Sequence, residues 1–219
     1  MYVKSYHVLT KAGNHIMAYD VVRKFEQTIA DYCGARYGVA VSSCTNAIFL
    51  CLKYGWDTQT IELPKHTYVG VAMSILNAGY KIKWGEDEWF GSYFLRPTPI
   101  CDSALRFERN MHIPDRFTCL SFHNRKHIPI GRGGMILTDS WEVVDWLKQA
   151  RYDGRLEKPS SDQPRFVVQG YNMYMTPEQA SRGLVLFNNI RDKRLPDIDD
   201  YDTYPDLSEV MKPLLRGNE

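Results

Sequence analysis

Residues 38–84 read GVAVSSCTNAIFLCLKYGWDTQTIELPKHTYVGVAMSILNAGYKIKW, and they decide the fold class. Three strand-like runs alternate with two helical segments, in the order 38–43, 45–55, 60–64, 68–79 and 80–84. Each helical segment ends at a glycine, which is a common helix stop. This alternation is typical of an α/β fold in which helices cover a mainly parallel sheet. We therefore predict a three-layer sandwich whose ligand site lies at the carboxyl ends of the strands.

The rest of the chain supplies further elements of the same kind. The predicted strands are 98–102, 118–122 and 133–138, and the predicted helices are 18–34, 141–154 and 176–189. The last helix begins with Thr176 at the N-cap, and Gln179 closes a capping box. Beyond residue 190 the chain is acidic and contains three prolines, so we expect an extended tail with few packing signals and one short helix at 206–211. The predicted organisation is one domain over 1–190 and an acidic tail over 191–219.

The composition excludes several classes of function. Charge is nearly balanced, with 27 basic and 26 acidic side chains, so neither nucleic acid nor a membrane surface is expected as the main partner. No apolar run is long enough to cross a membrane, and residues 1–13 lack the apolar core of a signal peptide. The five cysteines show no paired spacing, which indicates reduced thiols in a cytoplasmic protein. The histidines show no recognised metal-ligand spacing, so no metal site is expected.

Polar side chains follow the predicted strands directly. Ser43 and Thr45 precede a helix, where hydroxyl and free N–H groups suit a phosphate dianion, although ordinary helix capping also explains them. Tyr68 could stack on a flat ring or pack in the core. Asp102 ends an apolar strand, where a carboxylate needs a cationic or proton-donating partner, unless it caps a helix. Lys126 follows a further strand; its amine could attack a carbonyl if it is desolvated, or face solvent in a basic loop.

Together these residue types match the needs of pyridoxal 5′-phosphate. Its phosphate requires N–H groups and hydroxyls, and its ring requires a flat partner. Its pyridine nitrogen requires a carboxylate that keeps it protonated, and its aldehyde requires a lysine. The strand-end residues supply one group for each requirement, in order along one α/β chain.

The chain also resembles the DegT/DnrJ/EryC1/StrS family of sugar aminotransferases, which have fold type I, from about Val21 to Leu186. Five ordered stretches carry the resemblance: KFEQTIADYCGARYGVAVSSCTNAI, LPKHTYVGVAMSILNAGY, DSAL, SFHNRKHIPIGRGG and GYNMYMTPEQASRGLVLF. They match the family patterns fE…SSGTaAL, vPsfTf, DaAq, SFh..K…GeGG and GYNyRmt, and the spacing within SFHNRKHIPIGRGG is kept.

The resemblance implies a role for each candidate residue. Lys126 is expected to form the internal aldimine with pyridoxal phosphate and to shuttle a proton, while Asp102 pairs with the pyridinium nitrogen and Tyr68 stacks on the ring. The residues expected to hold the phosphate are Ser43, Cys44, Thr45 and Ser121. Asn172 is expected to reach the site of the neighbouring subunit, which implies a homodimer. An amino acid, commonly glutamate in this family, donates the amino group, and a keto sugar on a nucleotide accepts it.

The chain departs from the family pattern in several places. Family residues are replaced by Cys44 (a glycine), Leu105 (a glutamine or histidine), Arg132 (a glutamate) and Tyr174 (an arginine). The stretch between Trp84 and Asp102 is short for the family, and the smaller C-terminal domain is expected to be absent, in which case the acidic tail could wrap the partner subunit. The alternative function is therefore a truncated cofactor-binding homologue with a different pyridoxal phosphate reaction or with no catalytic activity.

Overall fold

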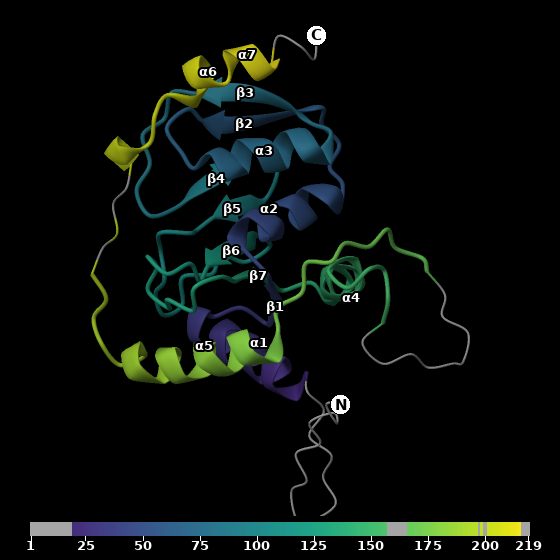
Figure 1. The fold of residues 1–219 in the computed structure, drawn as a ribbon, viewed down its shortest axis with the longest axis vertical. Helices are drawn as coiled ribbons and strands as arrows, with labels where there is room; N and C mark the ends of the chain where they lie inside the picture. Colours follow the sequence, from purple (N-terminus) through teal and green to yellow (C-terminus); the bar gives the residue numbers. More distant parts are fainter. Residues whose placement is uncertain (1–18, 157–165, 197, 199–200, 216–219) are drawn as a thin grey trace, which may run out of the picture.

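The computed structural model describes residues 19–156, 166–196, 198 and 201–215, which form an α/β fold (Figure 1). The strands are β1 (Tyr37–Val41), β2 (Thr60–Pro64), β3 (Lys81–Gly85), β4 (Tyr93–Leu95), β5 (Ile100–Asp102), β6 (Phe117–Ser121) and β7 (Gly134–Thr138). The helices are α1 (Asp20–Cys33), α2 (Cys44–Lys53), α3 (Val69–Ala78), α4 (Trp141–Ala150), α5 (Pro177–Ile190), α6 (Leu207–Val210) and α7 (Lys212–Leu215), with a 3-10 turn at Tyr201–Thr203.

Most strands run in one direction, as predicted. Five strands pair in the order β1-β7-β6-β5-β4, and β2 and β3 form a parallel pair. The two sets meet where the Glu62 N–H donates to the carbonyl of Arg96 at 2.8 Å. Following these pairings, β1, β2, β3, β5 and β6 share one direction, while β4 and β7 run opposite to their neighbours. The sheet is therefore mixed, with β4 and β7 opposed to the common direction.

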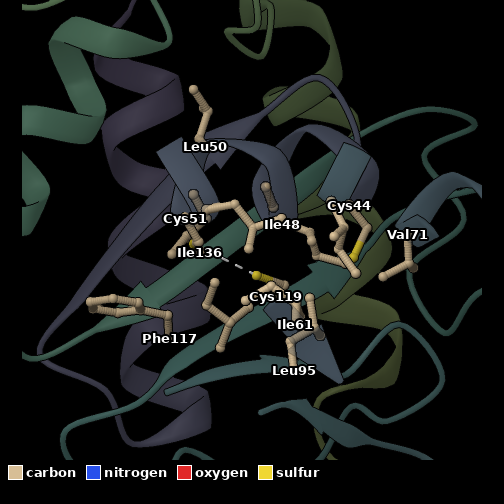
Figure 2. Close-up of a cluster of buried hydrophobic side chains, with 14 of the residues drawn as sticks. Cys44, Ile48, Leu50, Cys51, Ile61, Val71, Leu95, Phe117, Cys119 and Ile136 are labelled. Carbon is tan, nitrogen blue, oxygen red and sulfur yellow. Dashed lines mark hydrogen bonds between the residues drawn. The ribbon is translucent and has the colours of Figure 1, made fainter. Parts of the chain in front are cut away.

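Both faces of the larger sheet are buried, which confirms the three layers. Ile136 of β7 belongs to a hydrophobic cluster with α2, α3 and α4, whereas its neighbours Met135 and Leu137 belong to a second cluster with α1 and α5. This alternation follows from the two-residue period of a strand. Figure 2 shows the first cluster, where Ile48 and Cys51 of α2 pack near Ile136 and Cys119.

The helices begin and end within two residues of the predicted bounds, except that α4 ends at Ala150 and not at the predicted residue 154. Gly34 and Gly79 end α1 and α3 in the left-handed conformation, with φ of 81° and 95°. Ser140 is the N-cap of α4. Thr176 caps α5, and both hydrogen bonds of the predicted capping box with Gln179 are present.

Strand β4 is the element that the sequence pattern does not reveal. It has three residues and pairs antiparallel with β5, which places Tyr93 opposite Asp102. Two prolines follow it closely, at Pro97 and Pro99, and prolines are depleted in strands. The strand therefore depends on pairing with β5 rather than on its own pattern.

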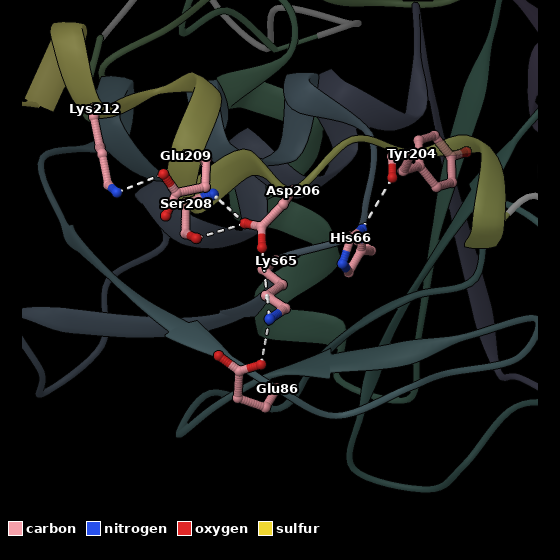
Figure 3. A network of polar contacts seen from close by, with 8 residues as sticks. All are labelled: Lys65, His66, Glu86, Tyr204, Asp206, Ser208, Glu209 and Lys212. Carbon is pink, nitrogen blue, oxygen red and sulfur yellow. Dashed lines mark hydrogen bonds and ion pairs between the residues drawn. The ribbon is translucent and has the colours of Figure 1, made fainter.

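The C-terminal segment 201–215 packs on its own chain (Figure 3). The Leu207 N–H donates to the carbonyl of Lys65 at 2.9 Å, and Lys65 Nζ lies 3.5 Å from Asp206 Oδ2. Leu207 and Met211 are only 2% and 4% exposed and belong to the cluster that also contains α2. The predicted short helix is present as α6. The segment packs in the core, although its sequence carries few packing signals.

Candidate active site

A cavity of about 720 Å³ lies beside the start of α2 and the ends of β5 and β6. Seven of the eight predicted site residues line it: Ser43, Cys44, Thr45, Tyr68, Asp102, Ser121 and Lys126. The cavity lies at the carboxyl ends of the strands, where the ligand site is predicted. The eighth residue, Asn172, is not among the lining residues.

The start of α2 forms one end of the cavity. The Ser43 hydroxyl accepts a hydrogen bond from the Asn46 N–H at 3.0 Å, so this side chain serves as the N-cap. Cys44 and Thr45 are the first two residues of the helix, and their N–H groups have no carbonyl within the helix to donate to. Those two N–H groups and the positive end of the helix dipole can bind an anion.

Gly134 explains how α2 comes to lie against the sheet. A Cβ atom at this position would lie 2.4 Å from the carbonyl carbon of Ser43 and 2.5 Å from the backbone nitrogen of Cys44. Only glycine leaves room for the helix start over the first residue of β7. The Gly-Gly pair of the SFHNRKHIPIGRGG stretch therefore shapes the anion-binding end of the cavity.

Asp102 is the acidic group of the site, and it is 6% exposed. Its Oδ2 accepts from the Tyr93 hydroxyl at 2.7 Å, and its Oδ1 accepts from the Ala104 N–H at 2.9 Å. Burial raises the pKa of Asp102, while these hydrogen bonds and the charge of Lys126 act in the opposite direction. A cationic group placed beside this carboxylate would offset the cost of burying it.

Tyr68 and Lys126 provide the ring and the amine. Tyr68 is 55% exposed, and a Cβ atom at Gly70 would lie 2.5 Å from the tyrosine ring and 3.0 Å from Thr45 Oγ1, so the ring lies close to the start of α2. Lys126 is half-buried in the turn after β6, where its N–H donates to the carbonyl of His123 at 2.9 Å. The cavity thus presents an amine, a carboxylate, an aromatic ring and an anion site together.

The four departures from the family pattern occupy different environments, and two of them line the cavity. Cys44 is buried, with its Sγ 3.9 Å from Asp102 Oδ1. Arg132 is exposed, and its Nε donates to the Ser42 carbonyl at 3.2 Å. Leu105 is 4% exposed and lines a different cavity. Tyr174 packs edge to face against Tyr19 and Tyr152, with ring centres 6.1 and 5.2 Å away.

Asn172 lies outside the cavity. It forms an isolated bridge with Tyr152, and its Nδ2 lies 3.4 Å from Asp153 Oδ2. Its predicted role in a neighbouring subunit stays a prediction.

Several lining residues were not predicted from the sequence. Tyr204 reaches the cavity from the C-terminal segment, where its carbonyl lies 3.0 Å from His66 Nδ1 (Figure 3). His123 and Arg125 precede Lys126 and also line the cavity. The charged stretch around Lys126 could have indicated these two, whereas nothing local marks Tyr204. Within the described ranges, no group of three or more His, Cys, Asp or Glu side chains is arranged to hold a metal ion.

Solved structures with the same fold include two bacterial proteins. The chain is similar to AtS13 from Actinomadura melliaura, with a TM-score of 0.67 and 18% identity over 78% of this chain and 60% of that one. It is also similar to the sugar aminotransferase CalS13 from Micromonospora echinospora, with a TM-score of 0.65 and 16% identity over 77% of this chain and 60% of that one. These likenesses establish the fold alone.

Sequence comparison gives a more specific result. The chain is 24% identical to the spore coat polysaccharide biosynthesis protein SpsC of Bacillus subtilis (strain 168), over 74% of this chain and 55% of that protein. It therefore spans little more than half the length of this relative. The model of the DegT/DnrJ/EryC1/StrS aminotransferase family matches residues 4–84 and 112–206, and leaves out 85–111, which contain β4 and β5. With most of its length matched by this model, the protein belongs to the DegT/DnrJ/EryC1/StrS aminotransferase family.

Proposed function

We propose that this protein is a pyridoxal-phosphate-dependent aminotransferase. It moves an amino group from an amino acid, with glutamate as the first candidate, to a keto sugar linked to a nucleotide. The observation that carries the proposal is the position of Lys126, Asp102 and the start of α2 on one cavity. Family membership supports the same reaction class.

The lining chemistry fits the cofactor. The N–H groups of Cys44 and Thr45 and the Ser121 hydroxyl suit its phosphate. Asp102 suits its pyridine nitrogen, since a buried carboxylate is stabilised by a protonated partner. Tyr68 suits its ring, and Lys126 suits its aldehyde. Each part of the cofactor therefore has a matching residue on the cavity wall.

Pyridoxal phosphate supplies an aldehyde that condenses with amines and a ring that withdraws electrons from the amine carbon. Lys126 Nζ is the amine that would hold the aldehyde and, once released, would move a proton at the substrate carbon. Asp102 would keep the pyridine nitrogen protonated, and the burial of this carboxylate would strengthen that interaction.

The basic side chains of the cavity favour an anionic acceptor. The cavity is lined by Arg125, Arg132 and His123, and Asp102 is the only carboxylate among the lining residues that the structure describes. Guanidinium groups bind phosphate oxygens well, as a nucleotide-linked sugar requires. The name of the relative SpsC, a spore coat polysaccharide biosynthesis protein, supports a sugar acceptor.

The wider organisation is also part of the proposal. Residues 1–190 form the cofactor-binding domain and 191–219 an acidic segment attached to it. The active unit is a homodimer in which Asn172 reaches the neighbouring subunit's phosphate. All five cysteines are unpaired and buried, which agrees with a cytoplasmic location.

The first test is an absorption spectrum of the protein with pyridoxal phosphate. We expect a visible band from the lysine-bound cofactor, absent in Lys126→Ala and retained in Lys24→Ala, which removes an exposed lysine on α1. Glutamate should then bleach the band, and a nucleotide-linked keto sugar should restore it. A wild-type protein without a band would refute the proposal. A band that glutamate and other amino acids leave unchanged would favour a binder without transaminase activity.

A further inference from the structure

Two buried hydroxyl groups, those of Tyr93 and Thr67, connect to Asp102 by hydrogen bonds. Tyr93 stands opposite Asp102 across the β4–β5 pair, and its hydroxyl donates to Asp102 Oδ2 at 2.7 Å. Thr67 Oγ1 lies 2.7 Å from the same tyrosine oxygen. Tyr93 is 8% exposed and Thr67 is 2% exposed, so bulk water does not compete for these bonds.

The hydrogen bonds in this group have a fixed direction. A phenol carries one proton, and Tyr93 gives it to the carboxylate, so its oxygen must accept from the Thr67 hydroxyl. The bonds therefore run from Thr67 to Tyr93 to Asp102. Bonds aligned in this way strengthen one another in a buried setting. The other carboxylate oxygen accepts from the Ala104 N–H at 2.9 Å, and Cys44 Sγ lies 3.9 Å from it.

We infer that Thr67 and Tyr93 are positioning residues that hold the Asp102 carboxylate, ionised and in one orientation, for the cofactor's ring nitrogen. Neither residue lines the cavity, so both act through Asp102. Thr67 directly precedes Tyr68, and the pair therefore also links the residue proposed to stack on the ring to the residue proposed to hold its nitrogen. This inference rests on the proposed function.

Tyr93 and Asp102 lie together in residues 85–111, which the family model does not match, whereas Thr67 lies in a matched range. The other groups that face Asp102 are Lys126, whose charge favours the carboxylate, and the Cys44 thiol.

The first arm of the test needs no cofactor. The carboxyl carbon of Asp102 can be followed by NMR in the full chain labelled with 13C-aspartate, and assigned from its loss in Asp102→Asn. Because the Tyr93 hydrogen bond lowers the pKa of Asp102, Tyr93→Phe should move the titration midpoint upward. Tyr80→Phe is the matched control. It removes a hydroxyl that donates to the Leu52 carbonyl at 3.1 Å, away from the cavity lining, and should leave the midpoint unchanged.

The second arm measures the affinity for pyridoxal phosphate from the visible band. We expect Tyr93→Phe and Thr67→Val to bind about tenfold more weakly, because each breaks a hydrogen bond in a chain that ends on a charge. Thr67→Ser keeps the hydroxyl and should restore affinity to the wild-type value. Tyr80→Phe should bind as the wild type does even if it loses stability.

The outcomes separate the inference from the proposed function. A Tyr93→Phe protein with an unchanged Asp102 titration and unchanged affinity overturns the inference while leaving the aminotransferase proposal intact. Weak binding in Thr67→Ser equal to that in Thr67→Val also overturns it, since the hydroxyl would then be irrelevant. A wild-type protein that binds no pyridoxal phosphate overturns the proposed function, and with it the role of the pair toward the cofactor, even where the Asp102 midpoint still moves.

Discussion

At the scale of single residues, Gly134 is a position where the backbone geometry leaves no room for a side chain. The Gly134→Ala substitution places a methyl group within 2.6 Å of three backbone atoms of Ser43 and Cys44. Either α2 or β7 must shift, and such overpacking costs about 1–3 kcal/mol. We expect a lower free energy of unfolding in urea and weaker pyridoxal phosphate binding, because the displaced atoms belong to the phosphate end of the cavity.

A second glycine provides the matched control. Gly85 also lies in a strand, but a Cβ atom there meets nothing closer than 3.5 Å. Gly85→Ala should therefore change stability by no more than about 0.5 kcal/mol and should leave cofactor binding unchanged. Equal effects of the two substitutions would show that the contact with α2 is not the cause.

The sequence predicts the residues at the strand ends, but it does not predict the residue that hydrogen-bonds to Asp102. Asp102 and Ser121 end strands and Lys126 follows one, and the sheet brings these positions to one edge, so the sequence can predict that they share a cavity. Tyr93 is not found, because its partner is set by the register between β4 and β5. A tyrosine in a short, proline-flanked run carries no local signal for that register.

At the scale of elements, a buried ion pair joins α1 to the end of α4. Arg151 donates to Glu26 and to the carbonyl of Ala40, and Glu26 accepts from the Ala40 N–H at 2.9 Å. Both charged residues are at most 3% exposed. Arg151→Ala leaves the buried Glu26 carboxylate with Lys148 Nζ, 3.8 Å away, and the Ala40 N–H as partners. The loss should therefore reach at most about 3–5 kcal/mol, the cost of a buried charge left without its partner. We expect urea unfolding to show a loss of up to that size.

An exposed pair four residues away serves as the control. Arg155 donates to Asp153 at 2.8 Å, with both side chains more than a third exposed. Arg155→Ala should cost at most about 1 kcal/mol, as is usual for surface pairs. If Arg151→Ala were no more damaging than Arg155→Ala, the buried pair would not be what holds α1 against β1 and α4.

Among the helices and strands too, the sequence predicts some features and not others. Helices α1, α3, α4 and α5 carry their own caps and stops, so the sequence marks their ends. The direction of β7 is reversed relative to β6, and the strand pattern of the sequence does not mark this reversal. The strand β4 exists only because β5 pairs with it, and no window of sequence contains that information.

At the scale of the whole molecule, the C-terminal segment completes both the core and the cavity. Leu207 and Met211 bury themselves in the cluster formed by α2, α3 and the sheet, and Tyr204 lines the cavity wall. Lys65 forms ion pairs with Glu86 and Asp206, which fix the segment beside the end of β2. These contacts join residues that are far apart in sequence. The acidic composition of the tail therefore gives no local signal for them.

The proposed homodimer can be tested by complementation between two inactive sites. Lys126→Ala lacks the amine, while Asn172→Ala lacks the group proposed to reach the neighbouring phosphate. In a mixed dimer, the site built on the Asn172→Ala chain keeps its own Lys126 and receives Asn172 from the Lys126→Ala chain. That site is intact, so we expect tight pyridoxal phosphate binding at one of the two sites of each mixed dimer, as measured by the visible band of the isolated mixed dimers. A matched pair in which both chains carry Asn172→Ala should not restore tight binding.

The contrary result would be mixed dimers that are seen by sedimentation velocity but bind the cofactor no better than the single variants. It would show that Asn172 acts within its own chain or not at all. The position of Asn172 outside its own cavity favours the first result, because a residue that served its own site should be found on that site's wall.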